Sequence, residues 1–153
     1  MIVLRDVVML DADLVLEWVN DPVARSMSFR GAVVERNDHL LWLENRINDD
    51  QTLFWIGEIA SEPFGLVRFA VRDGAAEITS VISPTFRGRG LASLLFSAGI
   101  MRLAASRSDV KVVWGIAKPE NNASIRTFER IGFVRSDRVQ HLGCDGVRFE
   151  MLL

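Results

Sequence analysis

Several residue types are scarce or absent in this chain of 153 residues, and each scarcity excludes a class of protein. The single cysteine, Cys144, cannot form an internal disulfide, and with only two histidines in the chain there is no ligand cluster for structural zinc. Tyrosine is absent altogether, so no phenol can act as an acid or a base. We therefore expect a protein of a reducing, cytoplasmic compartment that binds no metal.

An excess of one charge and a long apolar run are also lacking. Lys and Arg together number 18 and Asp and Glu 20, and the net charge of −2 disfavours strong binding to nucleic acid. The apolar start of the chain ends at Arg5 and Asp6 with no basic region before it, so we expect no signal peptide. The longest apolar stretch, residues 91–105, contains Arg102 and is too short to span a bilayer. We expect neither a nucleic-acid nor a membrane partner.

The chain does have the balance of a globular domain, with 49% apolar and 25% charged residues. No linker or repeat interrupts it, so we expect one domain over residues 1–153. Hydrophobic periodicity predicts helices and strands in the order β-α-α-β-β-β-α-β-α-β-β. The strands are expected at 2–4, 52–59, 64–72, 75–83, 110–117, 133–140 and 146–153. The helices are expected at 14–19, 34–47, 91–106 and 121–131, with a loop at 26–31. Antiparallel strands followed by a βαβ crossover predict an α/β mixed sheet with helices on both faces.

The segment 82–92 runs from a strand through a Gly-rich turn directly into a helix. Backbone N–H groups at a helix start bind phosphate, Gly88 and Gly90 would let them approach it, and Arg87 and Arg89 add positive charge. The segment lacks the third glycine of a dinucleotide fingerprint and the Gly-Lys-Ser/Thr of a P-loop. By itself it favours phosphate binding and a tight turn with solvated arginines about equally.

A second segment, residues 121–133, reads Asn-x-x-Ser followed by Phe128 and Gly-Phe. Together with the Arg-x-x-Gly-x-Ala pattern of residues 87–92, it resembles the GNAT N-acetyltransferase superfamily, and the resemblance covers essentially the whole chain. It implies the GNAT fold, in which a mostly antiparallel sheet splays apart at the acetyl-CoA site. It also implies acetyl-CoA as cosubstrate, with direct acetyl transfer to an amine and neither a metal nor a covalent enzyme intermediate.

The resemblance assigns the acetyl-CoA site residue by residue. The strand whose backbone would pair with the acetyl-pantetheine arm contributes Ser80, Val81 and Ile82. The pyrophosphate would lie against Arg87, Gly88, Arg89, Gly90, Leu91, Ala92 and Ser93. Asn121 would bind the pantetheine arm. Phe128 occupies the position at which many relatives have the tyrosine that protonates the leaving thiolate. Here that proton would come from water or from Ser124, or no acid is needed, and packing with Ile125 and Ile131 is the simpler role for Phe128.

The N-terminal third carries a second resemblance, in residues 17–29, in a His-x-x-Trp pair and in an Arg-Phe strand. These patterns are similar to GNAT enzymes of the pseudaminic and related nonulosonic acid pathways, which acetylate amino groups on nucleotide-linked sugars. The resemblance implies an acceptor slot formed by Arg25, Phe29, His39, Trp42 and Arg68. Without it, a packed Trp42 and a surface His39 would be the simpler interpretation.

An attacking amine must lose a proton, and Glu77 is the best carboxylate candidate for the base. It lies on the strand that enters the acyl site and shares a face with Thr79 and Val81. Arg68 could pair with Glu77 or hold substrate, and a purely structural ion pair fits equally well.

The sequence thus predicts an N-acetyltransferase for a small-molecule primary amine, with a nucleotide-linked amino sugar as the leading acceptor. Acetylation of a protein N-terminus and a CoA-binding module with little turnover are the alternatives. A homodimer is left open.

Overall fold

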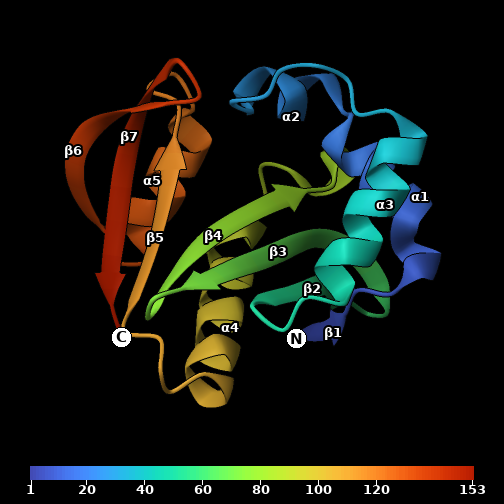
Figure 1. Ribbon diagram of the computed structural model, residues 1–153, viewed down its shortest axis with the longest axis horizontal. Helices are drawn as coiled ribbons and strands as arrows, with labels where there is room; N and C mark the ends of the chain where they lie inside the picture. The colour runs from blue at the N-terminus through green and yellow to red at the C-terminus, as the bar shows by residue number, and fades with distance from the viewer.

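The computed structural model describes all 153 residues and contains one seven-stranded sheet with helices on both faces (Figure 1). The strands are β1 (Ile2–Asp6), β2 (Thr52–Ile59), β3 (Glu62–Arg72), β4 (Ala75–Ile82), β5 (Val112–Ala117), β6 (Val134–His141) and β7 (Cys144–Leu152). Their order across the sheet is β1-β2-β3-β4-β5-β7-β6, and every neighbouring pair is antiparallel except β4–β5. This mostly antiparallel mixed sheet confirms the predicted fold class.

Four longer helices divide between the two faces of the sheet. Helices α1 (Ala12–Val19) and α3 (Arg36–Ile47) cover one face, and α4 (Leu91–Ser106) and α5 (Asn122–Arg130) cover the other. The apolar core divides in the same way. A larger cluster including Phe69, Leu95 and Phe149 lies under α4 and α5, and a smaller one including Val15 and Leu43 lies under α1 and α3. None of the helices is long and apolar enough to cross a membrane.

The segment after α1 differs from the prediction of a loop at 26–31. Residues Pro22–Met27 form a short helix, α2, because the Asp21 carboxylate accepts a hydrogen bond from the backbone N–H of Ala24 (3.1 Å). Pro22, in the first turn, also favours the helix because its ring fixes φ near the helical value. Helix α3 starts at Arg36 instead of residue 34, because the side-chain amide of Asn20 forms two hydrogen bonds with the backbone of Val34.

Strands β4 and β5 are hydrogen-bonded neighbours over only three positions. The pairs are Ala75 with Val112, Ala76 with Val113, and Glu77 with Trp114. Beyond these pairs the two strands diverge, so that they lie close together at one end and far apart at the other (Figure 1). The rest of β4 therefore has no strand on that side. The opening, called the splay below, is the one that the family resemblance implied.

Candidate active site

The end of β4 leads through a single 3-10 turn, Pro84–Phe86, to the start of α4 at one side of the splay. Gly88 (φ 75°) and Gly90 (φ 73°) both have the left-handed backbone conformation that favours glycine. A Cβ atom on Gly88 would meet no other atom within 4 Å, so the space outside the turn is open. Gly90 precedes the first residue of α4, and no side chain caps the helix. The first N–H groups of α4 are therefore available to an anion.

Two cations lie beside this uncapped helix start. Arg89 is exposed, and its guanidinium carbon lies 5.1 Å from the centroid of the Phe86 ring. Arg130, at the end of α5, has its Nη1 atom 3.8 Å from the position that a Cβ atom on Gly90 would occupy. The sequence patterns did not single out Arg130, because its approach to the turn depends on how α5 packs beside α4. Together the two side chains add positive charge to the turn.

Arg87 has different surroundings from Arg89. Its guanidinium forms an ion pair with Asp21 (2.8 Å), the residue that caps α2. Burial raises the pKa of the Asp21 carboxyl, but the Ala24 N–H and the Arg87 guanidinium outweigh it and hold that pKa below its usual range. The predicted contact of Arg87 with the pyrophosphate would require this ion pair to open.

The start of α5 lies behind the splay, on the side of α4. Asn121 caps α5 by accepting a hydrogen bond from the backbone N–H of Ser124 (3.2 Å). The cap occupies its side-chain oxygen, which leaves the amide nitrogen for the predicted contact with pantetheine. Ser124 lies one turn before Phe128 and is half-buried, so it shares the helix face that packs on the sheet.

Phe128 is a core residue, in agreement with the simpler of the roles predicted for it. Its side chain is 4% exposed, and its ring stacks on Phe149 with centroids 4.8 Å apart. The tip of the ring faces Gly115, where a Cβ atom would lie 2.6 Å from the Phe128 Cζ. Gly115 follows the last paired residue of β5, so the tip lies just behind the point at which the strands diverge.

The face of the splay nearer α3 carries Glu77, Arg68 and Trp42. Arg68 lies opposite Thr79 in the β3–β4 register, and the alternation along β4 places Glu77 on the same face, as predicted. The Arg68 guanidinium lies over the Trp42 ring, 5.3 Å from its centroid, and it forms no ion pair with Glu77, which was one of the two alternatives. Burial lowers the pKa of Arg68 by more than the nearby Glu77 charge raises it.

Two residues predicted to contact the acceptor are bound within the protein. His39 is 2% exposed, and its Nε2–H donates to the carbonyl of Ala12 (2.9 Å). Burial lowers the pKa of His39, which favours the neutral form of the imidazole. The Arg25 guanidinium donates to three backbone carbonyls, those of Val19, Arg30 and Ala32. Both side chains therefore stabilise the backbone of the N-terminal third and do not project toward an acceptor.

The opposite wall of the splay carries aromatic residues. Trp114 of β5 is half-buried on the same sheet face as Glu77, and the Arg148 guanidinium lies 4.1 Å from its ring centroid. The sequence analysis missed Trp114, although its alternation with the buried Val113 places it away from the α4 side of the sheet. Phe29 lies beside the end of β6, with its ring edge-on to His141 at a centroid distance of 4.9 Å.

Residues 21–29 cross the open end of the splay and contact both of its walls. Asp21 binds Arg87 next to the end of β4, and the Lys118 ammonium, just after β5, donates to the carbonyl of Ser26 (3.1 Å). Figure 1 shows α2 at this end of the sheet. These contacts tie the N-terminal third of the chain to both walls of the splay.

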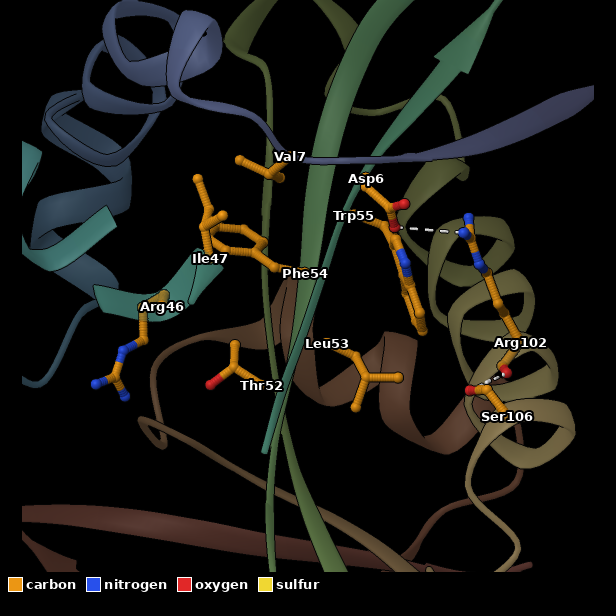
Figure 2. Close-up of a pocket in the computed structure, with 10 residues that line it drawn as sticks. All are labelled: Asp6, Val7, Arg46, Ile47, Thr52, Leu53, Phe54, Trp55, Arg102 and Ser106. Carbon is orange, nitrogen blue, oxygen red and sulfur yellow. Dashed lines mark hydrogen bonds and ion pairs between the residues drawn. The ribbon is translucent and has the colours of Figure 1, made fainter. Parts of the chain in front are cut away.

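A separate cavity of about 420 Å³ lies at the free edge of β2, where β1 ends (Figure 2). It is lined by Asp6, Val7, Arg46, Ile47, Thr52, Leu53, Phe54, Trp55, Arg102 and Ser106. Figure 2 shows Arg46, Thr52 and Phe54 on one side of β2, and Trp55 and Arg102 on the other. Nowhere in the chain do three or more His, Cys, Asp or Glu side chains gather as metal ligands would.

Comparison with known proteins agrees with this geometry. A sequence model described as the acetyltransferase (GNAT) domain matches residues 2–134. An acetyltransferase of Sodalis glossinidius (strain morsitans) is 32% identical over 109 residues, which are 70% of this chain and 75% of that protein.

Solved structures share the fold at lower identity. A spermidine N-acetyltransferase from Vibrio cholerae, bound to CoA and spermine, has a TM-score of 0.88 at 19% identity and covers 99% of this chain and 95% of its own. An aminoglycoside acetyltransferase bound to coenzyme A has a TM-score of 0.85 at 20% identity. The match covers 99% of this chain and 95% of that one. A ribosomal-protein α-N-acetyltransferase bound to coenzyme A has a TM-score of 0.86 at 16% identity. The match covers 99% of this chain and 94% of that one.

The fold and the family match define an acetyltransferase. The chain belongs to the GNAT acetyltransferase domain family. It is an N-acetyltransferase that uses acetyl-CoA as the acyl donor.

Proposed function

We propose that acetyl-CoA binds in the splay, with its pantetheine arm along the free edge of β4 and its pyrophosphate at the start of α4. The observation that carries this proposal is the early end of the β4–β5 ladder beside an uncapped helix N-terminus. Backbone groups of Ser80 to Ile82 can pair with the pantetheine amides, as an added strand would. The N–H groups of α4, with Arg89 and Arg130, fit a pyrophosphate. Bound there, the thioester supplies an activated acetyl group.

Glu77 and Ser124 would handle protons on opposite faces of the sheet. Glu77 faces the α3 side, from which the amine arrives, and would accept the proton that the amine loses as it attacks. Ser124 lies on the α5 side, where its hydroxyl, or a water beside it, would return a proton to the departing thiolate. In this proposal the proton acceptor, Glu77, and the proton donor, Ser124 or its water, lie on opposite faces of the sheet.

We further propose that the acceptor is a small-molecule primary amine, and specifically the amine of a nucleotide-linked amino sugar. Trp42 and Trp114 lie on the Glu77 face of the sheet, each with an arginine guanidinium over its ring, so an acceptor there would meet aromatic side chains and positive charge. A peptide N-terminus would favour an acidic groove. The carboxylates on this face are few, and that of Glu150 is bound to Arg148 (2.8 Å).

The test is thiol release from acetyl-CoA with a matched set of acceptors. A uridine-diphosphate-linked deoxy-amino sugar is expected to give a kcat/KM at least tenfold above that of a peptide with a free N-terminus. The same free amino sugar, without the nucleotide, is the control for amine reactivity. Preference for the peptide would replace the proposed acceptor with the protein N-terminus.

The role of Glu77 is tested in the same assay. Glu77→Gln is expected to lower the turnover number by roughly 10²–10⁴-fold and to remove the rise of rate with pH, because the general base is lost. Glu62→Gln, on an exposed residue of β3, is the control and should match the wild type. If Glu77→Gln retains the wild-type rate and pH profile at saturating amine, ordered water must accept the proton.

A further inference from the structure

Arg68 is a half-buried arginine with no polar partner in the protein. Its guanidinium makes no hydrogen bond and no ion pair, its defined neighbour is the Trp42 ring, and its nitrogens remain reachable from solvent. Partly removing a guanidinium from water without a protein acceptor costs free energy, so Arg68 adds little to the stability of the fold. Arg68 therefore needs a reason other than stability.

The other half-buried arginines of this chain, Arg46 excepted, do have acceptors. Each is held by a carboxylate or by backbone carbonyls, and the set comprises Arg5, Arg25, Arg87, Arg102, Arg107 and Arg148. The lack of a partner is thus not a general feature of arginines at this depth. Among the half-buried arginines, the lack of a hydrogen bond is confined to Arg68 and Arg46.

Arg46 lines the cavity at the edge of β2. It lies one turn after Trp42 on α3, so the two side chains share a helix face. Its Nε atom is enclosed and has no hydrogen-bond partner, and its Nη1 atom lies 3.9 Å from the nearest carboxylate oxygen, on Asp49. The charge of Arg46 is near enough to lower the pKa of Arg68, although burial lowers that pKa by more. Arg68 is therefore the half-buried arginine that has neither a hydrogen bond nor an ion pair, whereas Arg46 has Asp49.

We propose that Arg68 binds a phosphate or diphosphate group of the acceptor. This inference rests on the proposed function and specifies where the acceptor's anionic end lies. The planar fork of arginine matches phosphate oxygens, and the Arg68 guanidinium forms no ion pair that a phosphate would have to displace. Glu77 lies diagonally across β3–β4 from Arg68, a separation of about 7–8 Å between backbones. That spacing suits an amine and a phosphate on opposite sides of one sugar ring.

The first experiment measures anion binding without any acceptor. Inorganic pyrophosphate is titrated by calorimetry into the protein saturated with CoA, which fills the pyrophosphate site at α4. We expect Arg68→Gln to weaken this binding at least tenfold, because charge-assisted hydrogen bonds are lost. Arg72→Gln is the matched control, since Arg72 lies on the same strand and face but its side chain is 92% exposed, and it should bind within twofold of the wild type. Absence of pyrophosphate binding to the wild type, or equal binding by Arg68→Gln, would overturn the inference.

A second measurement separates a ligand-binding role from a structural one. Arg68→Met is expected to keep or raise the melting temperature, because an apolar side chain of similar length removes an unpaired buried charge. A clear drop in melting temperature, absent in Arg72→Met, would mean that the contact with Trp42 stabilises the fold and would count against the inference.

The outcomes also distinguish this inference from the proposed acceptor. If pyrophosphate binds through Arg68 but the nucleotide-linked sugar is not acetylated, the anion subsite stands and the sugar assignment fails. If the sugar is acetylated equally well by Arg68→Gln and the wild type, the acceptor stands and the subsite fails.

Discussion

At the scale of single residues, depth of burial separates side chains that bind from side chains that pack. His39 illustrates packing, since its neutral ring donates to the Ala12 carbonyl and stacks on Trp42 with centroids 5.9 Å apart. Arg68, on the other side of Trp42, keeps an unpaired charge where an acceptor would arrive. Trp42 therefore contacts both His39, which packs within the fold, and Arg68, which we propose binds the acceptor.

The burial of His39 predicts a pH-dependent stability. Its pKa is lowered from 6.5 in the folded chain, mainly by burial, so the unfolded chain binds more protons below that pH. The contribution of His39 is fully present above pH 6.5 and is lost as the pH falls through the folded pKa. Urea unfolding between pH 7.5 and 5 should show a slope of at most about 1.4 kcal/mol per pH unit from this residue.

His39→Gln keeps an N–H donor for Ala12 and should flatten that slope. His141→Gln removes the other histidine of the chain and is the control, expected to retain the wild-type slope. Identical slopes for His39→Gln and the wild type would contradict the assignment.

Phe128 gives the second prediction at this scale. In Phe128→Tyr the new hydroxyl would extend from Cζ toward Gly115, into a contact that is already close. We expect a loss of about 1–3 kcal/mol in the free energy of unfolding from overpacking. The turnover number should change by less than about 100-fold, the lower limit for a true general acid.

Phe133→Tyr, in the same aromatic cluster, controls for adding a hydroxyl to the core. A gain in turnover above 100-fold in Phe128→Tyr alone would mean that the natural enzyme lacks an acid that the reaction needs.

At the scale of elements, α4 combines a buried body with an uncapped start. Its central residues, including Leu95, Gly99 and Leu103, pack into the larger core cluster and fix the helix against the sheet. The first turn meets no capping side chain, so its N–H groups face outward through the Gly88–Gly90 turn. A rigid helix thus presents a fixed set of donors to an anion.

Gly90→Glu tests this element. A carboxylate in front of the N–H groups would repel the pyrophosphate and occupy its space, and acetyl-CoA affinity measured by calorimetry should fall at least tenfold. Gly143→Glu is matched in backbone strain, because Gly143 (φ 78°) and Gly90 (φ 73°) share the left-handed conformation. Gly143 lies in the β6–β7 turn, so the acetyl-CoA affinity of Gly143→Glu should stay within twofold of the wild type. Equal acetyl-CoA affinities in the two variants would mean that the pyrophosphate binds elsewhere.

At the scale of the whole molecule, residues 21–29 join the two halves of the sheet across the splay. Phe29 reaches the β6–β7 hairpin, where its Cζ lies 3.3 Å from the position of a Cβ atom on Gly146. Asp21 and Ser26 make the other two contacts, with Arg87 and Lys118. The open end of the sheet is thus held by a segment from the N-terminal third of the chain.

Phe29→Ala should loosen this crossing without changing the acetyl-CoA site. Hydrogen exchange of residues 21–33 should speed up, and kcat/KM for the acceptor should fall more than tenfold while acetyl-CoA affinity stays within twofold. Val23→Ala, at an exposed position of α2, is the control and should leave all three quantities unchanged. A parallel loss of acetyl-CoA affinity in Phe29→Ala would show that the crossing supports the cofactor side instead.

Local patterns were sufficient for most of the elements and for the turn at the start of α4. The strand boundaries in the middle of the sheet follow from period-two alternation and from the turns at residues 60–63 and 73–74, and the structure has them within one or two residues. The left-handed glycines of the turn were predictable because the segment from strand to helix leaves few other conformations. Helix α2 was missed because its six residues bury nothing and depend on the Asp21 cap.

By itself, the sequence determined the fold class through its periodicity, and the resemblance of residues 87–92 and 121–133 to GNAT enzymes implied the family and the splay. Only the tertiary structure decided which side chains remain free to act. His39 and Trp42 share a helix face in any α-helix, yet packing against the sheet buried one and left the other at the approach to the splay. Arg25 and Arg87 are bound to distant backbone or to Asp21, whereas Arg68 has no partner. The physical reason is that burial and pairing are set by contacts between residues far apart in sequence, which no local spacing records.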